Sequence, residues 1–172
     1  MTHPVHVGLV GMGTVGTGVV RVLQDSADHI ARQAGRPLIV KHVVVQEPKK
    51  PRSVELSDER LSNDLRKITD DSAISVVAVL LGGLEPARTI CLELLRSGKD
   101  LVTANKALLA EHGPELFQTA REAGRSIAFE AAIGGGIPIV AAISECLTGN
   151  RISSIRGILN GTSNFILTKM EQ

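Results

Sequence analysis

Three glycines near the N-terminus have the spacing of a phosphate-binding turn. Gly11, Gly13 and Gly16 form the pattern G-x-G-x-x-G within GMGTVG, between a β-branched run and a helical pattern. In such a turn the first glycine permits the bend, the second lets the backbone approach a pyrophosphate, and the third lets helix pack on strand. The following helix, beginning at Thr14, offers N–H groups and a partial positive charge. The pattern predicts dinucleotide binding, and the alternative is a glycine-rich turn without a ligand.

The loop after the second expected strand carries opposing charges. Glu47 stands near the end of that strand, farther from the glycines than the roughly 20 residues that are usual. A carboxylate there would accept a hydrogen bond from a ribose 2′-hydroxyl and repel a 2′-phosphate, which favours NAD. Lys49, Lys50 and Arg52 could instead hold that phosphate, or belong to a solvated loop. NAD and NADP both remain open as the cofactor.

Two charged residues follow later expected strands. Lys106 comes just after the strand expected at 100–104, at the edge where open α/β sheets bind ligands. It could stabilise an alkoxide or take part in proton transfer, and the alternative is a surface lysine that begins a helix. Glu130 is expected near the end of a strand at 126–132, either paired or partly solvated, because burying a lone carboxylate is costly. Carbonyl groups of the next glycine turn could join it around a cation.

Strand and helix patterns alternate along the chain. The expected strands cover 5–10, 38–45, 75–81, 100–104, 126–132 and 151–159. The expected helices cover 14 to about 34, 86–98, 106–123 with a break near Gly113 and Pro114, 137–147, and a last segment capped by Thr162 or Ser163; 46–73 is expected to be loop with one short helix. Largely apolar strands separated by helices predict an α/β fold with a Rossmann-like parallel sheet and helices on both faces. We place an NAD(P)-binding domain at 1–133 and the start of a second, α+β domain at 134–172.

Composition excludes several classes of function. Hydrophobic residues make up 43% and charged residues 22%, and the net charge of +1 gives no strong attraction to nucleic acid or an anionic membrane. Without Trp or Tyr, stacking on single-stranded nucleic acid is not available. Cys91 and Cys146 lie among apolar neighbours in helical patterns, so we expect buried, inert thiols. No apolar run is long enough for a membrane span, and we expect a cytoplasmic protein without a signal peptide.

Five motifs together resemble homoserine dehydrogenase. They are GLVGMGTVGTGVV, LLGGLEPAR, LVTANKALLAEHG, FEAAIGGGIPI and GILNGTSNFILTKM, in that order, and the match is weak only at 46–75. The resemblance implies interconversion of homoserine and aspartate semialdehyde with NAD or NADP, on the route to threonine and methionine, by a homodimer. Aspartate semialdehyde dehydrogenase fits less well. It would need a nucleophilic cysteine, and neither Cys91 nor Cys146 is expected at the C-terminal edge of a strand.

The resemblance also implies roles for individual residues. The pyrophosphate would be held by Gly11, Gly13, Thr14, Val15 and Gly16. Gly82 and Thr103 would lie along the ribose and nicotinamide, with Lys106 beside the reacting oxygen. Lys50 matches a basic residue of the family near the 2′-position, where the position of Glu47 in the sequence also points. A monovalent cation, Na⁺, would be held by Glu130 and the carbonyls of Ile133, Gly135 and Ile137. The substrate pocket would include Asn160, Gly161 and Thr162.

The chain departs from the family pattern in three places. Gln46 and Glu47 stand where the family often has Arg-Asp, and Val79 stands where it often has a glutamate. In the family, the last helix continues into a substrate and dimer domain about as long again, which supplies further acidic residues and a second lysine. We therefore expect a fragment that binds cofactor but turns over homoserine slowly. The alternative is a non-catalytic dinucleotide-binding module of the same ancestry.

Overall fold

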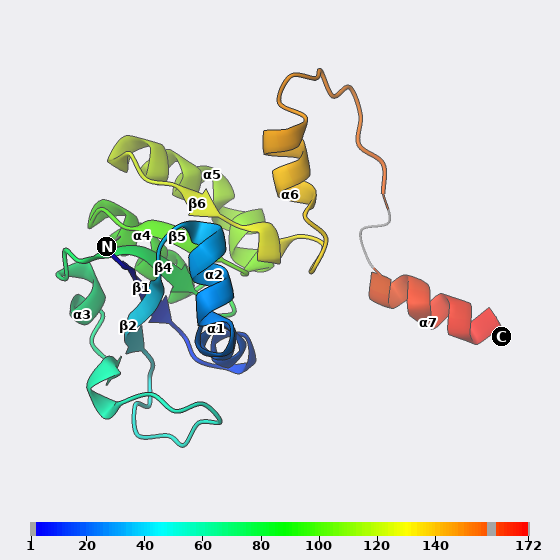
Figure 1. Cartoon of the computed structure of the whole chain (residues 1–172). Coiled ribbons are helices and arrows are strands. Elements are labelled where there is room, and N and C mark those ends of the chain that lie inside the picture. The colour runs from blue at the N-terminus through cyan, green and yellow to red at the C-terminus, as the bar shows by residue number, and fades with distance from the viewer. Residues whose placement is uncertain (1–2, 158–160, 172) are drawn as a thin grey trace.

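The computed structural model describes residues 3–157 and 161–171 (Figure 1). Its centre is a parallel sheet in the order β3-β2-β1-β4-β5-β6. The strands are β1 (Val5–Val10), β2 (Leu38–Val44), β3 (Leu61–Ser62), β4 (Ile74–Val79), β5 (Asp100–Thr103) and β6 (Ile127–Ala128). This is the strand order of doubly wound dinucleotide-binding sheets, in which the direction of winding reverses between β1 and β4. The predicted fold class is confirmed.

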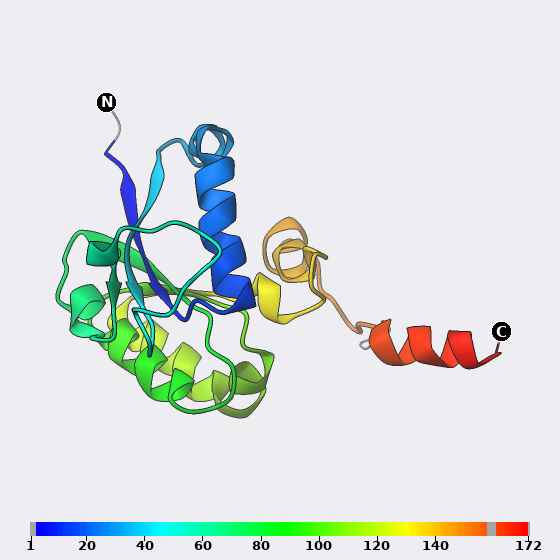
Figure 2. The ribbon, with the colours of Figure 1, turned by 90° about the horizontal axis from the view of Figure 1, so that it is seen from below.

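Helices cover both faces of the sheet (Figure 2). One face carries α1 (Thr14–Asp25) and α2 (Ala27–Ala34), and the opposite face carries α4 (Ala87–Arg96) and α5 (Lys106–Ala123). A 3₁₀ turn (Asp58–Arg60) and α3 (Arg66–Thr69) lie between β2 and β4. After the sheet come a 3₁₀ turn (Glu130–Ala132), α6 (Ile139–Ala141), a π-helical turn (Ala142–Cys146) and α7 (Gly161–Glu171).

Two hydrophobic clusters hold these layers together. Leu9 and Val43 are buried in the cluster that contains Val20 of α1. Their neighbours in sequence, Val10 and Val44, belong to the cluster beneath α4 and α5. Successive strand residues point to opposite faces, so a run of consecutive apolar residues fills both clusters at once. This explains why the strands are apolar throughout.

The first expected helix is two helices. Ser26 leaves the helical region at φ −115° and ψ 22°, and it is both the C-cap of α1 and the N-cap of α2. Ser and Asp side chains compete with helical hydrogen bonds, and Asp25 and Ser26 are consecutive residues of this kind. The prediction of one continuous helix to about residue 34 was wrong at this point.

The helix α5 runs unbroken through Pro114, where we expected a break. Leu108 lies before the proline and Leu116 after it, and both are buried in the same cluster. Packing on both sides keeps the two halves in line and outweighs the helical hydrogen bond that proline removes.

Three further expectations needed correction. The strand expected at 126–132 is only β6, because Phe129 leaves the extended region at φ −140° and ψ 22°. The strand expected at 151–159 is not formed in its described part, 151–157, which is exposed and runs away from the sheet (Figure 1). A strand needs a hydrogen-bonded neighbour, and no described strand pairs with this segment. The short strand β3, which pairs with β2, was missed within 46–73.

Candidate functional site

The three glycines of the N-terminal motif have different structural roles. Gly11 has φ +91°, and a Cβ there would lie 2.9 Å from the carbonyl oxygen of Leu80. A Cβ on Gly16 would collide with the carbonyl oxygen of Gly11. A Cβ on Gly13 would meet nothing within 4 Å. The first and third glycines are therefore required by the fold, and the second leaves open space at the start of α1.

The N-terminus of α1 is suited to an anion. Gly13 is its N-cap, no side chain among the described residues caps it, and its first turn contains no acidic residue. The first N–H groups of any helix have no intrahelical acceptor, and the helix dipole adds a partial positive charge. Thr14 and Val15, the first two residues of α1, are exposed. The predicted pyrophosphate site thus has the chemistry that a phosphate needs.

Two grooves meet beside this helix end. The first, about 650 Å³, runs from the glycine turn to the loop after β2. The second, about 550 Å³, is lined by Val15 of α1 and by Lys106 with its neighbours at the start of α5. Both are lined by Leu80, Leu81 and Gly82, which follow β4. The structure therefore brings the glycine motif, Gly82 and Lys106 together at the C-terminal edge of the sheet, where doubly wound sheets bind ligands.

Lys106 is an exposed residue at the first position of α5. A cation there faces the positive end of the helix dipole, so the position does not favour lysine for stability. This observation supports the functional interpretation of Lys106 over that of a surface lysine. It faces the groove that Val15 also lines.

The residue before it, Asn105, was missed by the sequence analysis. Its side chain is nearly buried, accepts a hydrogen bond from the Leu108 N–H and donates to the carbonyls of Leu81 and Gly83. The signal was available, because asparagine is a preferred N-cap and here directly precedes a helical pattern. Thr103, expected along the ribose and nicotinamide, is only 2% exposed. Its hydroxyl donates to the Val79 carbonyl and accepts from the Asn105 N–H, and its side chain lines neither groove.

The loop after β2 forms the far end of the first groove. Glu47, Lys50 and Arg52 all line it. The Arg52 guanidinium donates to three carbonyls of the same loop, those of Glu47 at 2.7 Å, Pro48 at 2.9 Å and Lys50 at 2.7 Å. Arg52 thus holds the loop in shape, while the side chains of Glu47 and Lys50 are exposed.

Glu130 lies in the 3₁₀ turn after β6 and not at the end of a strand, as expected. Its carboxylate accepts from the N–H groups of Val140 at 2.9 Å and Ala141 at 2.8 Å, and so ties this turn to α6. The intervening glycine turn includes Gly134 and Gly136, both at positive φ. The carbonyl of Ile137 accepts from Ile139 N–H. In the described residues, no group of three or more His, Cys, Asp or Glu could hold a metal ion. The Na⁺ site with the carbonyls of Ile133 and Gly135 stays a prediction.

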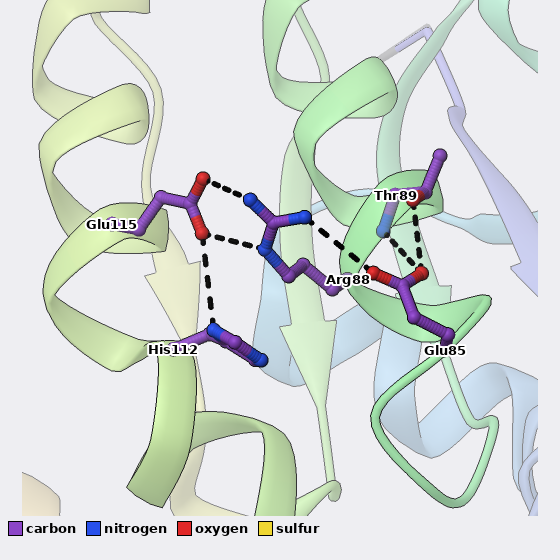
Figure 3. Close-up of polar contacts among 5 residues, drawn as sticks. All are labelled: Glu85, Arg88, Thr89, His112 and Glu115. Atoms are coloured by element: carbon purple, nitrogen blue, oxygen red, sulfur yellow. Dashed lines mark hydrogen bonds and ion pairs between the residues drawn. The ribbon is translucent and has the colours of Figure 1, made fainter.

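A network of ion pairs and hydrogen bonds links α4 to α5 (Figure 3). Arg88 of α4 donates to both carboxylate oxygens of Glu115 of α5, with its Nε at 2.7 Å from Oε2. Glu85, which lines the first groove, accepts from the Thr89 hydroxyl at 2.9 Å. The hydrogen bond from Arg88 lowers the pKa of Glu115, and the one from Thr89 lowers the pKa of Glu85. His112 completes the network at 4.0 Å from Glu115.

The expected substrate residues come late in the chain, at 160–162. Asn160 lies outside the described residues. Gly161 and Thr162 begin α7, and in both ribbon views α7 stands apart from the sheet (Figures 1 and 2). Their role in binding substrate stays a prediction.

The two cysteines differ, although both were expected to be buried. Cys91 is buried, and desolvation raises the pKa of its thiol to about 12. Cys146 is exposed, because the π-helical turn that carries it packs little of its surface. Within residues 3–157 and 161–171, no helix is both long and apolar enough to cross a membrane.

Comparisons with known proteins point to one family. The family model described as "Homoserine dehydrogenase, NAD binding domain" matches residues 11–130, and the one described as "Homoserine dehydrogenase" matches residues 138–172. The homoserine dehydrogenase of Bacillus subtilis is 45% identical over 166 residues, and that of Synechocystis sp. is 48% identical over 170 residues. Each alignment covers 96% of this chain and 38% of the relative, so the chain spans well under half the length of these curated relatives.

Solved structures show the same relationship. A homoserine dehydrogenase from Thiobacillus denitrificans superposes with a TM-score of 0.85 at 43% identity, covering 98% of this chain and 39% of that one. One from S. aureus superposes with a TM-score of 0.78 at 34% identity, covering 99% of this chain and 40% of that one. Because a family model matches most of the sequence and the fold agrees, the chain belongs to the homoserine dehydrogenase family.

Proposed function

We propose that this chain is the nucleotide-binding part of an NAD(P)-dependent homoserine dehydrogenase, which interconverts homoserine and aspartate 4-semialdehyde in threonine and methionine biosynthesis. The observation that carries the proposal is the pair of grooves that joins the open N-terminus of α1 to Lys106. An anion-binding helix end and a cation lie along one sheet edge, as a cofactor phosphate and a reacting oxygen would require.

The residues of the grooves fit a nicotinamide dinucleotide. Gly13 leaves room at the helix end for a pyrophosphate, and the first groove extends from there to Glu47 and Lys50. The adenosine ribose would lie at that end, and the nicotinamide in the second groove between Val15 and Lys106. When bound, the nicotinamide ring supplies a hydride to the aldehyde carbon, or accepts one from the alcohol.

Lys106 would serve the oxygen of the reacting carbon. As the aldehyde carbon becomes tetrahedral, negative charge grows on that oxygen, and an ammonium group beside it stabilises the charge. The same group can donate a proton to form the alcohol of homoserine, and in the reverse direction the amine accepts it. Lys106 is exposed in the described chain, so the site must exclude water by closure over the groove.

Further features belong to the same proposal. Glu130 would hold Na⁺ with the carbonyls of Ile133, Gly135 and Ile137, beside the glycine turn that begins the second domain. Asn160, Gly161 and Thr162 would form part of the rim of the substrate pocket. The protein would be cytoplasmic. It would also form a homodimer, which fits the apolar side chains that α7 exposes, such as Phe165 at 64% and Met170 at 77%.

The test separates binding from turnover. We expect calorimetry to detect binding of NADH or NADPH by the chain, and NAD(P)H absorbance with homoserine to show turnover far below the ~10 per second of a typical enzyme. Lys106→Met should remove the remaining turnover with little effect on cofactor affinity, whereas Lys67→Met, an exposed lysine of α3, should change neither.

Each result has a distinct meaning. Cofactor binding without any homoserine-dependent absorbance change would favour the non-catalytic module. Absence of binding to either dinucleotide would contradict both functions. Turnover that survives Lys106→Met would show that another group serves the reacting oxygen.

A further inference from the structure

We propose that Asn105 is a positioning residue that sets the affinity for the dinucleotide. It holds the groove floor, which is the loop of Leu80, Leu81 and Gly82 after β4, in place relative to Lys106. The inference rests on the function proposed above, because it concerns the same groove. Asn105 is 8% exposed, and it lies between the two segments that line the second groove, the loop after β4 and the start of α5.

The side-chain amide is used in two directions. Its Oδ1 accepts from the Leu108 N–H at 3.0 Å and so caps α5. Its Nδ2 donates to the carbonyl of Leu81 at 3.0 Å and to that of Gly83 at 2.6 Å. One planar group therefore fixes the loop after β4 relative to the helix on which Lys106 is the first residue.

The same loop is held on its other side by the glycine turn. The Leu80 N–H donates to the Val10 carbonyl at 2.8 Å. A Cβ on Gly11 would lie 2.9 Å from both the Leu80 carbonyl oxygen and the Leu81 side chain. The phosphate-binding turn, the shared groove floor and Lys106 thus form one connected unit, and Asn105 is its link to α5.

Capping alone does not require asparagine at this position. Aspartate and serine cap helices about as well, because the cap needs only an oxygen acceptor. Only an amide combines that acceptor with two N–H donors on the same side chain. The donor half is what reaches the carbonyls of Leu81 and Gly83. Aspartate would leave those carbonyls facing a carboxylate, so the loop would move away from α5.

The test is Asn105→Asp, studied by calorimetry with NAD⁺ and NADP⁺ against the unsubstituted chain. At about pH 8 we expect about tenfold weaker binding, since two hydrogen bonds to the groove floor are lost. Helix content by circular dichroism should be unchanged, because aspartate keeps the cap.

Two further variants separate positioning from general loosening. Asn105→Ser keeps a cap acceptor but has only one donor where the amide has two, so it should also bind the dinucleotides more weakly than the unsubstituted chain. Glu115→Gln weakens the ion pair with Arg88 on the outer side of α5, outside both grooves. It should lower the melting temperature and leave cofactor affinity within about twofold.

The outcomes distinguish this inference from the proposed function. A folded Asn105→Asp chain that binds as tightly as the unsubstituted one would overturn the role of Asn105 alone. Weaker binding that comes with a loss of helix content would also overturn it, because a failed cap and not the missing donor would then be the cause. Failure of the unsubstituted chain to bind either dinucleotide would overturn the role of Asn105 together with the proposed function.

Discussion

The α-carbon of Gly16 faces the carbonyl oxygen of Gly11 so closely that a Cβ would collide with it. This contact fixes where α1 starts relative to the turn that precedes it. Gly18, in the same helix, is exposed and would place a Cβ in open space. Replacing these two glycines of α1 by alanine should therefore change the stability of the fold in opposite directions.

Gly16→Ala should lower the free energy of unfolding by roughly 1–3 kcal/mol, because the backbone must shift to admit a methyl group. Gly18→Ala should raise it by roughly 0.5–1 kcal/mol, because alanine loses less entropy in a helix. Urea denaturation followed by circular dichroism measures both. Equal effects in the two variants would show that the start of α1 adjusts freely.

Gly13→Val should weaken dinucleotide binding by at least about tenfold with only a small fall in melting temperature. The valine side chain would enter the open space beside the helix N-terminus, where the pyrophosphate is expected. Calorimetry with NADH and NADPH provides the affinities. Gly18→Val, on the same helix but outside both grooves, is the control and should bind normally. Unchanged affinity in the Gly13 variant would rule out this turn as the phosphate site.

Glu47→Ala should shift the ratio of the two affinities toward NADP by about threefold to tenfold, because a carboxylate near the 2′-position repels the phosphate of NADP. Glu55→Ala removes the same charge outside the first groove and should leave the ratio unchanged. Dissociation constants for NADH and NADPH at one fixed ionic strength decide the matter.

Lys50→Ala examines the opposing charge at the same end of the groove. It should shift the ratio toward NAD, whereas Lys49→Ala, which lies outside that groove, should not. If neither Glu47→Ala nor Lys50→Ala moves the ratio, this loop is a solvated surface and does not select the cofactor.

Asp71 should stabilise the fold in a pH-dependent manner. Lys41 lies 2.6 Å from its carboxylate, and this hydrogen bond is the largest cause that lowers the pKa of Asp71. A carboxyl with a lower pKa in the folded state contributes stability above its unfolded pKa and loses it as pH falls through the folded value. Asp71→Asn should therefore cost up to about 1 kcal/mol at neutral pH, and the difference should fade in acid.

Urea denaturation of both proteins across that pH range is the measurement. The exposed Asp58→Asn is the matched control and should show little effect at any pH. A cost for Asp71→Asn that is the same at neutral and acidic pH would show that the ion pair with Lys41 is not its origin.

Local patterns were enough for the sheet and its helices. The strands β1, β2, β4 and β5 were predicted within one or two residues of their bounds, because each is a short apolar run next to a glycine or polar boundary. The glycine spacing likewise predicted a tight turn that opens a helix. Errors arose where local preference and tertiary packing disagree, as at Pro114, or where an edge strand is too short to show a pattern, as at β3.

The sequence by itself therefore determined the fold class, the glycine turn and the placement of Lys106 after a strand, since each depends on residues close together in the chain. Only the tertiary structure decided which groups meet. It buried the Thr103 hydroxyl, joined Asn105 to the loop after β4, and turned the Glu130 carboxylate onto the backbone of α6. These contacts link segments that are separated in the sequence. Their geometry depends on the order of the strands in the sheet and on the packing of the helices, and no local sequence pattern encodes either.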